Sequence, residues 1–181
     1  IDGTGRHWED GRVPSPGNEG QIAQTRNDEG FLNHVLEIMQ AEYPNRVDPG
    51  RMHLTGVSNG GFMAVRAACV ADEYPELSKL ASVAPVISTM AASLIDGTEG
   101  RPRCDNPSPP PMLWVVGKDV PTPNCMTYPC RQPISSGDGR VPYGQPGQTY
   151  NVFSPDLGEV TSMPDARDRV LSLAEQNSGA P

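Results

Sequence analysis

The residues around Ser58 constrain the fold more than any other part of the chain. They read Leu54-Thr55-Gly56-Val57-Ser58-Asn59-Gly60-Gly61, and residues 56–60 fit the pattern G-x-S-x-G. A serine in this pattern stands on a sharp turn between a strand and a helix, in a strained backbone conformation that lifts its hydroxyl clear of the sheet. Side chains would collide on either side of such a turn, so we expect Gly56 and Gly60 to be sterically required. Gly61 gives the next helix room to pack close to the strand.

The flanking residues have the character that this turn needs. Residues 51–55 form a short mixed run suited to a strand, and residues 62–70 are rich in helix formers with apolar side chains at helical spacing. Strand, turn and helix in this order are the context that makes the pattern informative. We therefore predict that Ser58 is a nucleophile; the alternative is an ordinary glycine-rich turn.

Size and charge narrow the classes of protein. A chain of 181 residues is long enough for one domain with a real core, so we treat residues 1–181 as a single domain. The net charge of −8 argues against nucleic acid or an anionic membrane as a partner. No stretch is apolar enough to span a membrane. The 20 prolines and 19 glycines indicate many loops.

The 4 cysteines are Cys69, Cys104, Cys125 and Cys130, without a C-x-x-C pair or a nearby histidine. A zinc site is therefore not expected, and no cofactor is indicated. An even number of cysteines among proline-rich loops favours two disulfides and an oxidising compartment. We favour Cys69 with Cys104 and Cys125 with Cys130 among the three possible connectivities. The alternative is that all are reduced.

The order of predicted elements indicates an α/β fold. A helix begins at Asn27 and ends before Pro44, a strand leads into Ser58, and a second helix runs to about Asp72. Residues 79–86 and 112–116 are predicted as strands, the latter buried on both faces because it is a continuous apolar run. A last helix follows Ser162, and its predicted buried positions are Ala166, Val170, Leu173 and Ala174. Alternating strands and helices predict a mostly parallel sheet covered on both sides.

Several stretches together resemble the polyhydroxybutyrate depolymerase and feruloyl esterase group of secreted α/β-hydrolases, over roughly the whole chain. They are DGTGRHWEDGR (2–12), NDEGFL (27–32), RMHLTGVSNGG (51–61), ASVAPV (81–86) and VPYG (141–144). The resemblance implies a three-layer sandwich with a mostly parallel sheet and a secreted serine esterase with a Ser-Asp-His triad. Its substrates would be polyhydroxyalkanoate, feruloyl or acetyl esters.

The resemblance also implies roles for individual residues. Ser58 would be the nucleophile, and the backbone N–H of Asn59 would be one oxyanion donor. Two residues compete as the acid, because a cysteine-bearing insert at 120–140 separates the family's two landmarks. Asp119 keeps the position at the end of a strand, whereas Asp138 keeps the spacing to the Val-Pro-Tyr stretch; we favour Asp119. Tyr143 is a candidate for substrate binding.

The chain departs from the family at the triad histidine. Its 3 histidines, His7, His34 and His53, all precede Ser58, whereas the family's histidine follows the last helix. The family's early strands are also missing, so we expect the sequence to be the central part of a hydrolase. Three interpretations follow: an esterase of which these residues are only a part, a non-catalytic binding or structural relative that lacks the base, or a hydrolase completed by a second chain.

Overall fold

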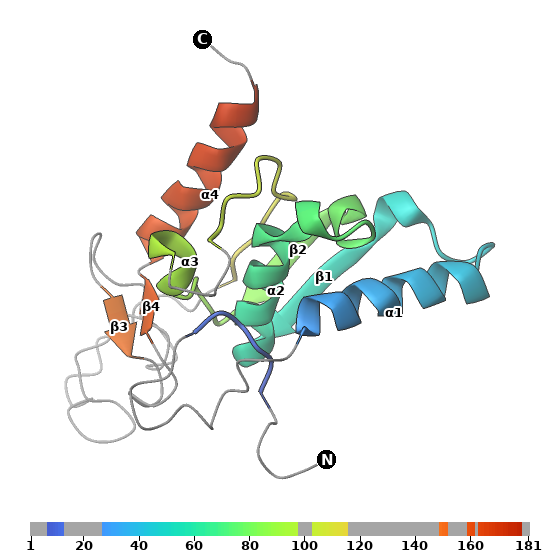
Figure 1. The fold of residues 1–181 in the computed structure, drawn as a ribbon, viewed down its shortest axis with the longest axis horizontal. Coiled ribbons are helices and arrows are strands. Elements are labelled where there is room, and N and C mark those ends of the chain that lie inside the picture. Colours follow the sequence, from blue (N-terminus) through green and yellow to red (C-terminus); the bar gives the residue numbers. More distant parts are fainter. Residues whose placement is uncertain are drawn as a thin grey trace.

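The structure, a computed structural model, describes residues 7–12, 27–97, 103–115, 149–151, 159–161 and 163–178. The α-helices are α1 (Asp28–Glu42), α2 (Asn59–Cys69), α3 (Ser93–Asp96) and α4 (Met163–Ser178). The strands are β1 (His53–Val57), β2 (Ser82–Val86), β3 (Thr149–Asn151) and β4 (Glu159–Thr161). Short 3-10 turns lie at Pro49–Arg51, Ala71–Glu73 and Leu77–Lys79. In Figure 1, α1 and α2 lie on the same side of β1 and β2.

The strands next to Ser58 run parallel. β1 pairs with β2 in a register that places His53 opposite Ser82 and Val57 opposite Val86. Residues 112–115 continue the sheet through parallel bridges from Val83 to Met112 and from Val86 to Val115. Separately, β3 and β4 form an antiparallel pair. Parallel strands joined through helices make this an α/β protein, as predicted.

The two faces of the parallel sheet have different surroundings. One face carries Leu54, Val83 and Met112, which pack into the core beneath the helices. The opposite face carries Val57 and Leu113, whose exposed fractions are 61% and 66%. The prediction that residues 112–116 are buried on both faces is therefore wrong for residues 112–115. An apolar run of this length fits a strand, but it does not reveal which of its faces are covered.

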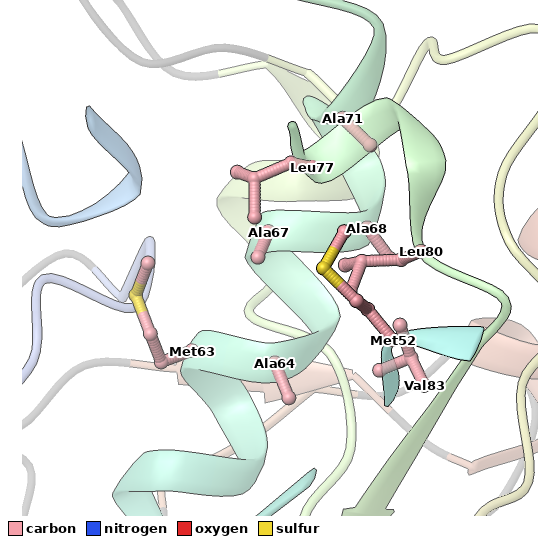
Figure 2. Packing of buried hydrophobic residues seen from close by; sticks show 9 residues of the cluster. All are labelled: Met52, Met63, Ala64, Ala67, Ala68, Ala71, Leu77, Leu80 and Val83. Atoms are coloured by element: carbon pink, nitrogen blue, oxygen red, sulfur yellow. The ribbon is translucent and has the colours of Figure 1, made fainter. Parts of the chain in front are cut away.

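Helix α2 is the centre of the core. Every residue from Gly61 to Cys69 is buried, so this helix is apolar nearly all round. One side packs against the sheet and α1; Figure 2 shows Met52, Ala68, Leu80 and Val83 meeting there. The other side packs against Met90 and Leu94 and against α4. A helix buried on all sides holds both of its ends in fixed positions.

The predicted disulfide between Cys69 and Cys104 is present, and it ties the end of α2 to the segment that precedes residues 112–115. This bond is compatible with an oxidising compartment. Cys125 and Cys130 lie outside the described residues. The part of the chain that the structure describes contains no helix that is long and apolar enough to cross a bilayer.

The ends of the helices follow the sequence signals closely. Asn27 caps α1 by accepting a hydrogen bond from the N–H of Gly30, at 2.7 Å, and α1 ends one residue before Tyr43. α4 buries Ala166 and Leu173 as predicted, but Ala174 is exposed. Ala174 follows Leu173 directly, so the helical rotation turns it toward solvent.

Candidate active site

Ser58 occupies the turn between β1 and α2 with a backbone that few residues adopt. Its φ is 55° and its ψ is −118°, which makes it one of two non-glycine residues at positive φ among the described residues. The turn is held at both ends, because the Ser58 N–H donates to the carbonyl of Val86 and the Ser58 carbonyl accepts from the N–H of Phe62, each at 3.0 Å. A strained residue held in this way is characteristic of functional turns.

The glycines around Ser58 are required to different degrees. A Cβ on Gly56 would overlap the carbonyl of Gly60 and lie 3.0 Å from its Cα. A Cβ on Gly61 would overlap Ser88 and lie 2.9 Å from the Val86 carbonyl oxygen. The lack of a side chain at Gly61 therefore lets α2 lie close to the end of β2 and the loop after it, rather than close to β1. Gly60 is different. Among the described atoms the nearest to its Cβ position is Trp8 Nε1 at 4.0 Å, so the expectation of crowding there is wrong.

A second strained residue lies at the same edge of the sheet. Ile87 follows β2 directly and has a φ of 51°, which is rare for a β-branched residue. Its N–H donates to the carbonyl of Val115 at 2.8 Å. Ser58 and Ile87 therefore stand side by side at the carboxyl ends of two paired parallel strands, where α/β proteins place their ligands. Sequence reasoning missed Ile87, because no local signal predicts positive φ for isoleucine.

The N-terminal segment 7–12 lies against the turn at the start of α2, as Figure 1 shows. The side chain of Asn59 accepts from the Trp8 N–H at 2.7 Å and donates to the Trp8 carbonyl at 3.3 Å and to Asp10 Oδ2 at 2.5 Å. Residues that are 51 positions apart in the sequence are therefore joined directly beside Ser58. We call residues 7–12 the N-terminal strap.

Two buried ionic groups fix the N-terminal strap to the helices. Asp10 and Arg12 form one pair at 2.6 Å, and their side-chain exposed fractions are 0% and 2%. Arg66 of α2 forms the other, with Glu29 of α1 and with Glu9 of the strap, whose Oε1 lies 3.5 Å from Arg66 Nη1. Buried charges must be paired, so these contacts fix geometry tightly. Sequence reasoning treated the strap as loop, and only its place in the family resemblance marked it.

An aromatic pair lies near the first residues of α2. The Trp8 and Phe31 rings have centroids 6.3 Å apart with planes tilted by 33°, and the residues are 36% and 54% exposed. Trp8 extends toward Gly60, the second residue after Ser58. Apolar surface is therefore available within two residues of Ser58.

The histidines are engaged or exposed. His53 Nδ1 is 2.8 Å from Ser82 Oγ on β2, and His34 Nδ1 is 3.1 Å from Glu37 Oε2 on α1. His53 is exposed, on the same face of the sheet as Val57. His7 is exposed and precedes Trp8, which the strap holds against Asn59.

The remaining predicted site residues lie outside the described part of the chain. They are Asp119, Asp138 and Tyr143. Asp105, which fits neither landmark for the acid, forms an ion pair with Arg169 of α4. The structure thus describes two of the predicted site residues, Ser58 and Asn59, which are consecutive at the turn between β1 and α2.

Two pKa shifts occur away from Ser58. A hydrogen bond from Lys79, and then one from Gln40, lower the pKa of Glu76 below its ordinary value of 4.5. Burial, followed by the charge of Glu29, raises the pKa of Tyr74 above 10.0. Both residues lie beyond the C-terminal end of α2, so these shifts concern stability rather than the turn at Ser58.

Among the described residues, no three His, Cys, Asp or Glu side chains gather in a way that could hold a metal ion. Comparison with known proteins found no family model, no curated protein and no solved structure that matches the chain. The functional interpretation therefore depends on the geometry around Ser58 and on the residues that surround it.

Proposed function

We propose that the chain belongs to a secreted serine esterase of the α/β-hydrolase type that cleaves carboxylic esters through an acyl-enzyme on Ser58. The observation that carries the proposal is the backbone of Ser58, at φ 55° between a parallel strand and a buried helix. The fold would be the three-layer sandwich of that superfamily, and the Cys69–Cys104 disulfide is consistent with secretion.

The chemistry follows from the turn. Ser58 Oγ would attack the ester carbonyl carbon, its proton would pass to a base, and the negative charge would develop on the carbonyl oxygen. The N–H of Asn59, in the first turn of α2, has no acceptor within its own helix and would donate to that oxygen. The alcohol then leaves, and water hydrolyses the acyl-serine to free acid and serine.

The substrate is an uncharged ester of a polyester or a plant polysaccharide, in keeping with the family resemblance. The net charge of −8 disfavours polyanionic substrates. The exposed Trp8 and Phe31 rings give an apolar ester a surface to contact beside Ser58. The proposal also includes a hydrolase in which a second chain supplies the base for Ser58.

A second candidate is a non-catalytic binding protein that keeps this scaffold. It is favoured by the histidines, because His53 and His34 bind Ser82 and Glu37. Without a base, serine is a weak nucleophile.

An active-site probe separates the two functions. A fluorophosphonate should label the protein at Ser58, identified by peptide mass, and p-nitrophenyl butyrate should be hydrolysed. Ser58→Ala is the variant that must lose both signals, and Ser78→Ala, on an exposed turn, is the matched control that must keep them. An unlabelled, inactive but folded protein would favour the binding function.

A further inference from the structure

The side chain of Asn59 is the point where the N-terminal strap meets the turn at Ser58. It makes three hydrogen bonds, two with the main chain of Trp8 and one with the carboxylate of Asp10. An amide side chain with three partners has one allowed orientation. The residue directly after Ser58 is therefore fixed through its side chain as well as through the helix.

Asp10 is itself held rigidly. Arg12 Nε lies 3.0 Å from Oδ1 and 2.9 Å from Oδ2, and the main-chain N–H of Arg12 donates to Oδ1 at 3.1 Å. The Arg12 guanidinium lies 4.7 Å above the ring of Phe62 in the first turn of α2. The strap therefore contacts the first turn of α2 at two places: Asp10 binds Asn59, and Arg12 packs over Phe62.

Stability does not explain such a buried pair. The desolvation of two charges roughly cancels their attraction, so an apolar replacement is often as stable. What a hydrogen-bonded buried pair does provide is a fixed position, in this case for a carboxylate oxygen 2.5 Å from Asn59 Nδ2. A fixed position of this carboxylate matters if the main-chain N–H of Asn59 must point at the oxyanion.

We propose that Asp10, held by Arg12, is a positioning residue that acts through the Asn59 side chain to aim the Asn59 main-chain N–H at the oxyanion formed when Ser58 attacks. The inference rests on the proposed function. Oxyanion donors act only when they are placed before the reaction, and displacement by about an ångström can cost roughly 100-fold in rate.

A double-mutant cycle tests whether Asp10 acts through Asn59. Asp10→Ala and Asn59→Ala should each lower kcat for p-nitrophenyl butyrate about 10- to 100-fold and leave KM within about twofold, because the interaction is made in the transition state. The kcat of the double variant should be no lower than that of the slower single variant, since both substitutions break the same link between Asp10 and Asn59. Glu76→Gln, a partly buried carboxylate that pairs with Lys79 beyond the C-terminal end of α2 and does not contact the strap, should keep kcat within about twofold.

The backbone can be measured without any substrate. The ¹⁵N order parameter of the Asn59 amide should be about 0.85 in the wild type and should fall in both single variants, but not in Glu76→Gln. Where Asp10→Ala fails to fold, Asp10→Asn replaces it in both measurements.

The outcomes separate the two hypotheses. If the losses of kcat in the two single variants multiply in the double variant, or if Glu76→Gln loses as much kcat as Asp10→Ala, the positioning role is overturned while the esterase stands. A full-length protein that shows no esterase activity, alone or with the chain that supplies its base, overturns the proposed function. In that case an unchanged order parameter of Asn59 in Asp10→Ala also overturns the positioning of the amide, and a decreased one supports it.

Discussion

The absence of a side chain at Gly56 allows β1 to enter the turn at Ser58. The position of its missing Cβ is occupied by the backbone of Gly60, which belongs to α2 and cannot move without shifting a helix that is buried throughout. Because the neighbouring atoms belong to the main chain, no side-chain rotation can make room for an added methyl group. The steric requirement therefore applies to Gly56, and Gly60 contributes its carbonyl rather than its own lack of a side chain.

Gly56→Ala should destabilise the protein by about 3 kcal/mol or more, because overpacking against backbone cannot be relieved by a rotamer change. The measurement is the free energy of unfolding in guanidinium chloride. Gly50→Ala is the matched control, since its Cβ would lie 3.4 Å from Asp48 Oδ1 and its φ is not positive. It should change stability by less than about 1 kcal/mol. Equal losses in the two variants would contradict this account of the turn.

At the scale of elements, the sequence predicted the features that depend on local residue patterns. The apolar spacing of α1 and α2, the Asn27 cap and the G-x-S-x-G turn all depend on residues within one or two turns of one another. Helix α3 was missed because its four residues are too few to show a period.

Contacts between distant segments could not be predicted in this way. Asp10 and Asn59 are 49 positions apart, and neither has a local pattern that indicates the other. The exposure of Leu113 depends likewise on what covers the sheet, which an apolar run does not encode. The elements of the candidate site were thus predictable, whereas the buried polar contacts that fix them were not.

The contact between α1 and the turn before β2 has a pH dependence of its own. Glu76 accepts from Lys79 Nζ at 2.7 Å and from Gln40 of α1, and these bonds lower its pKa below 4.5. The folded state therefore favours the carboxylate more than the unfolded state does. Its contribution to the free energy of unfolding is complete above pH 4.5 and is lost as the pH falls through the lowered pKa.

Glu76→Gln should therefore lower the free energy of unfolding at pH 7 by roughly 0.5 to 1 kcal/mol, and the difference from wild type should shrink as the pH falls below 4.5. Urea titrations at a series of pH values measure it. Glu37→Gln, in the exposed pair with His34, should change stability by less than about 0.5 kcal/mol. A difference that grows on acidification would show that the sign is wrong.

At the scale of the whole molecule, Arg66 joins three parts of the chain. It stands on α2 and reaches Glu29 of α1 and Glu9 of the N-terminal strap, while the Glu9 N–H donates to Asp28 Oδ2 at 2.7 Å. The side chains of Arg66, Glu29 and Glu9 are at most 7% exposed. Removing Arg66 takes the shared cation away from two buried carboxylates, whereas removing Glu29 together with Arg66 leaves only one of them, Glu9, in the interior.

Arg66→Met should therefore cost about 3 to 5 kcal/mol, because Glu29 loses its cation inside the core. The double variant Arg66→Met with Glu29→Met should recover part of that loss, since apolar side chains replace Glu29 and Arg66 while Glu9 remains without Arg66. Guanidinium unfolding of the wild type, both single variants and the double variant measures the coupling, and Arg51→Met, at an exposed position, should stay within about 0.5 kcal/mol of wild type. A double variant that is less stable than Arg66→Met would contradict this account, because removing Glu29 after its cation would then cost stability instead of restoring it.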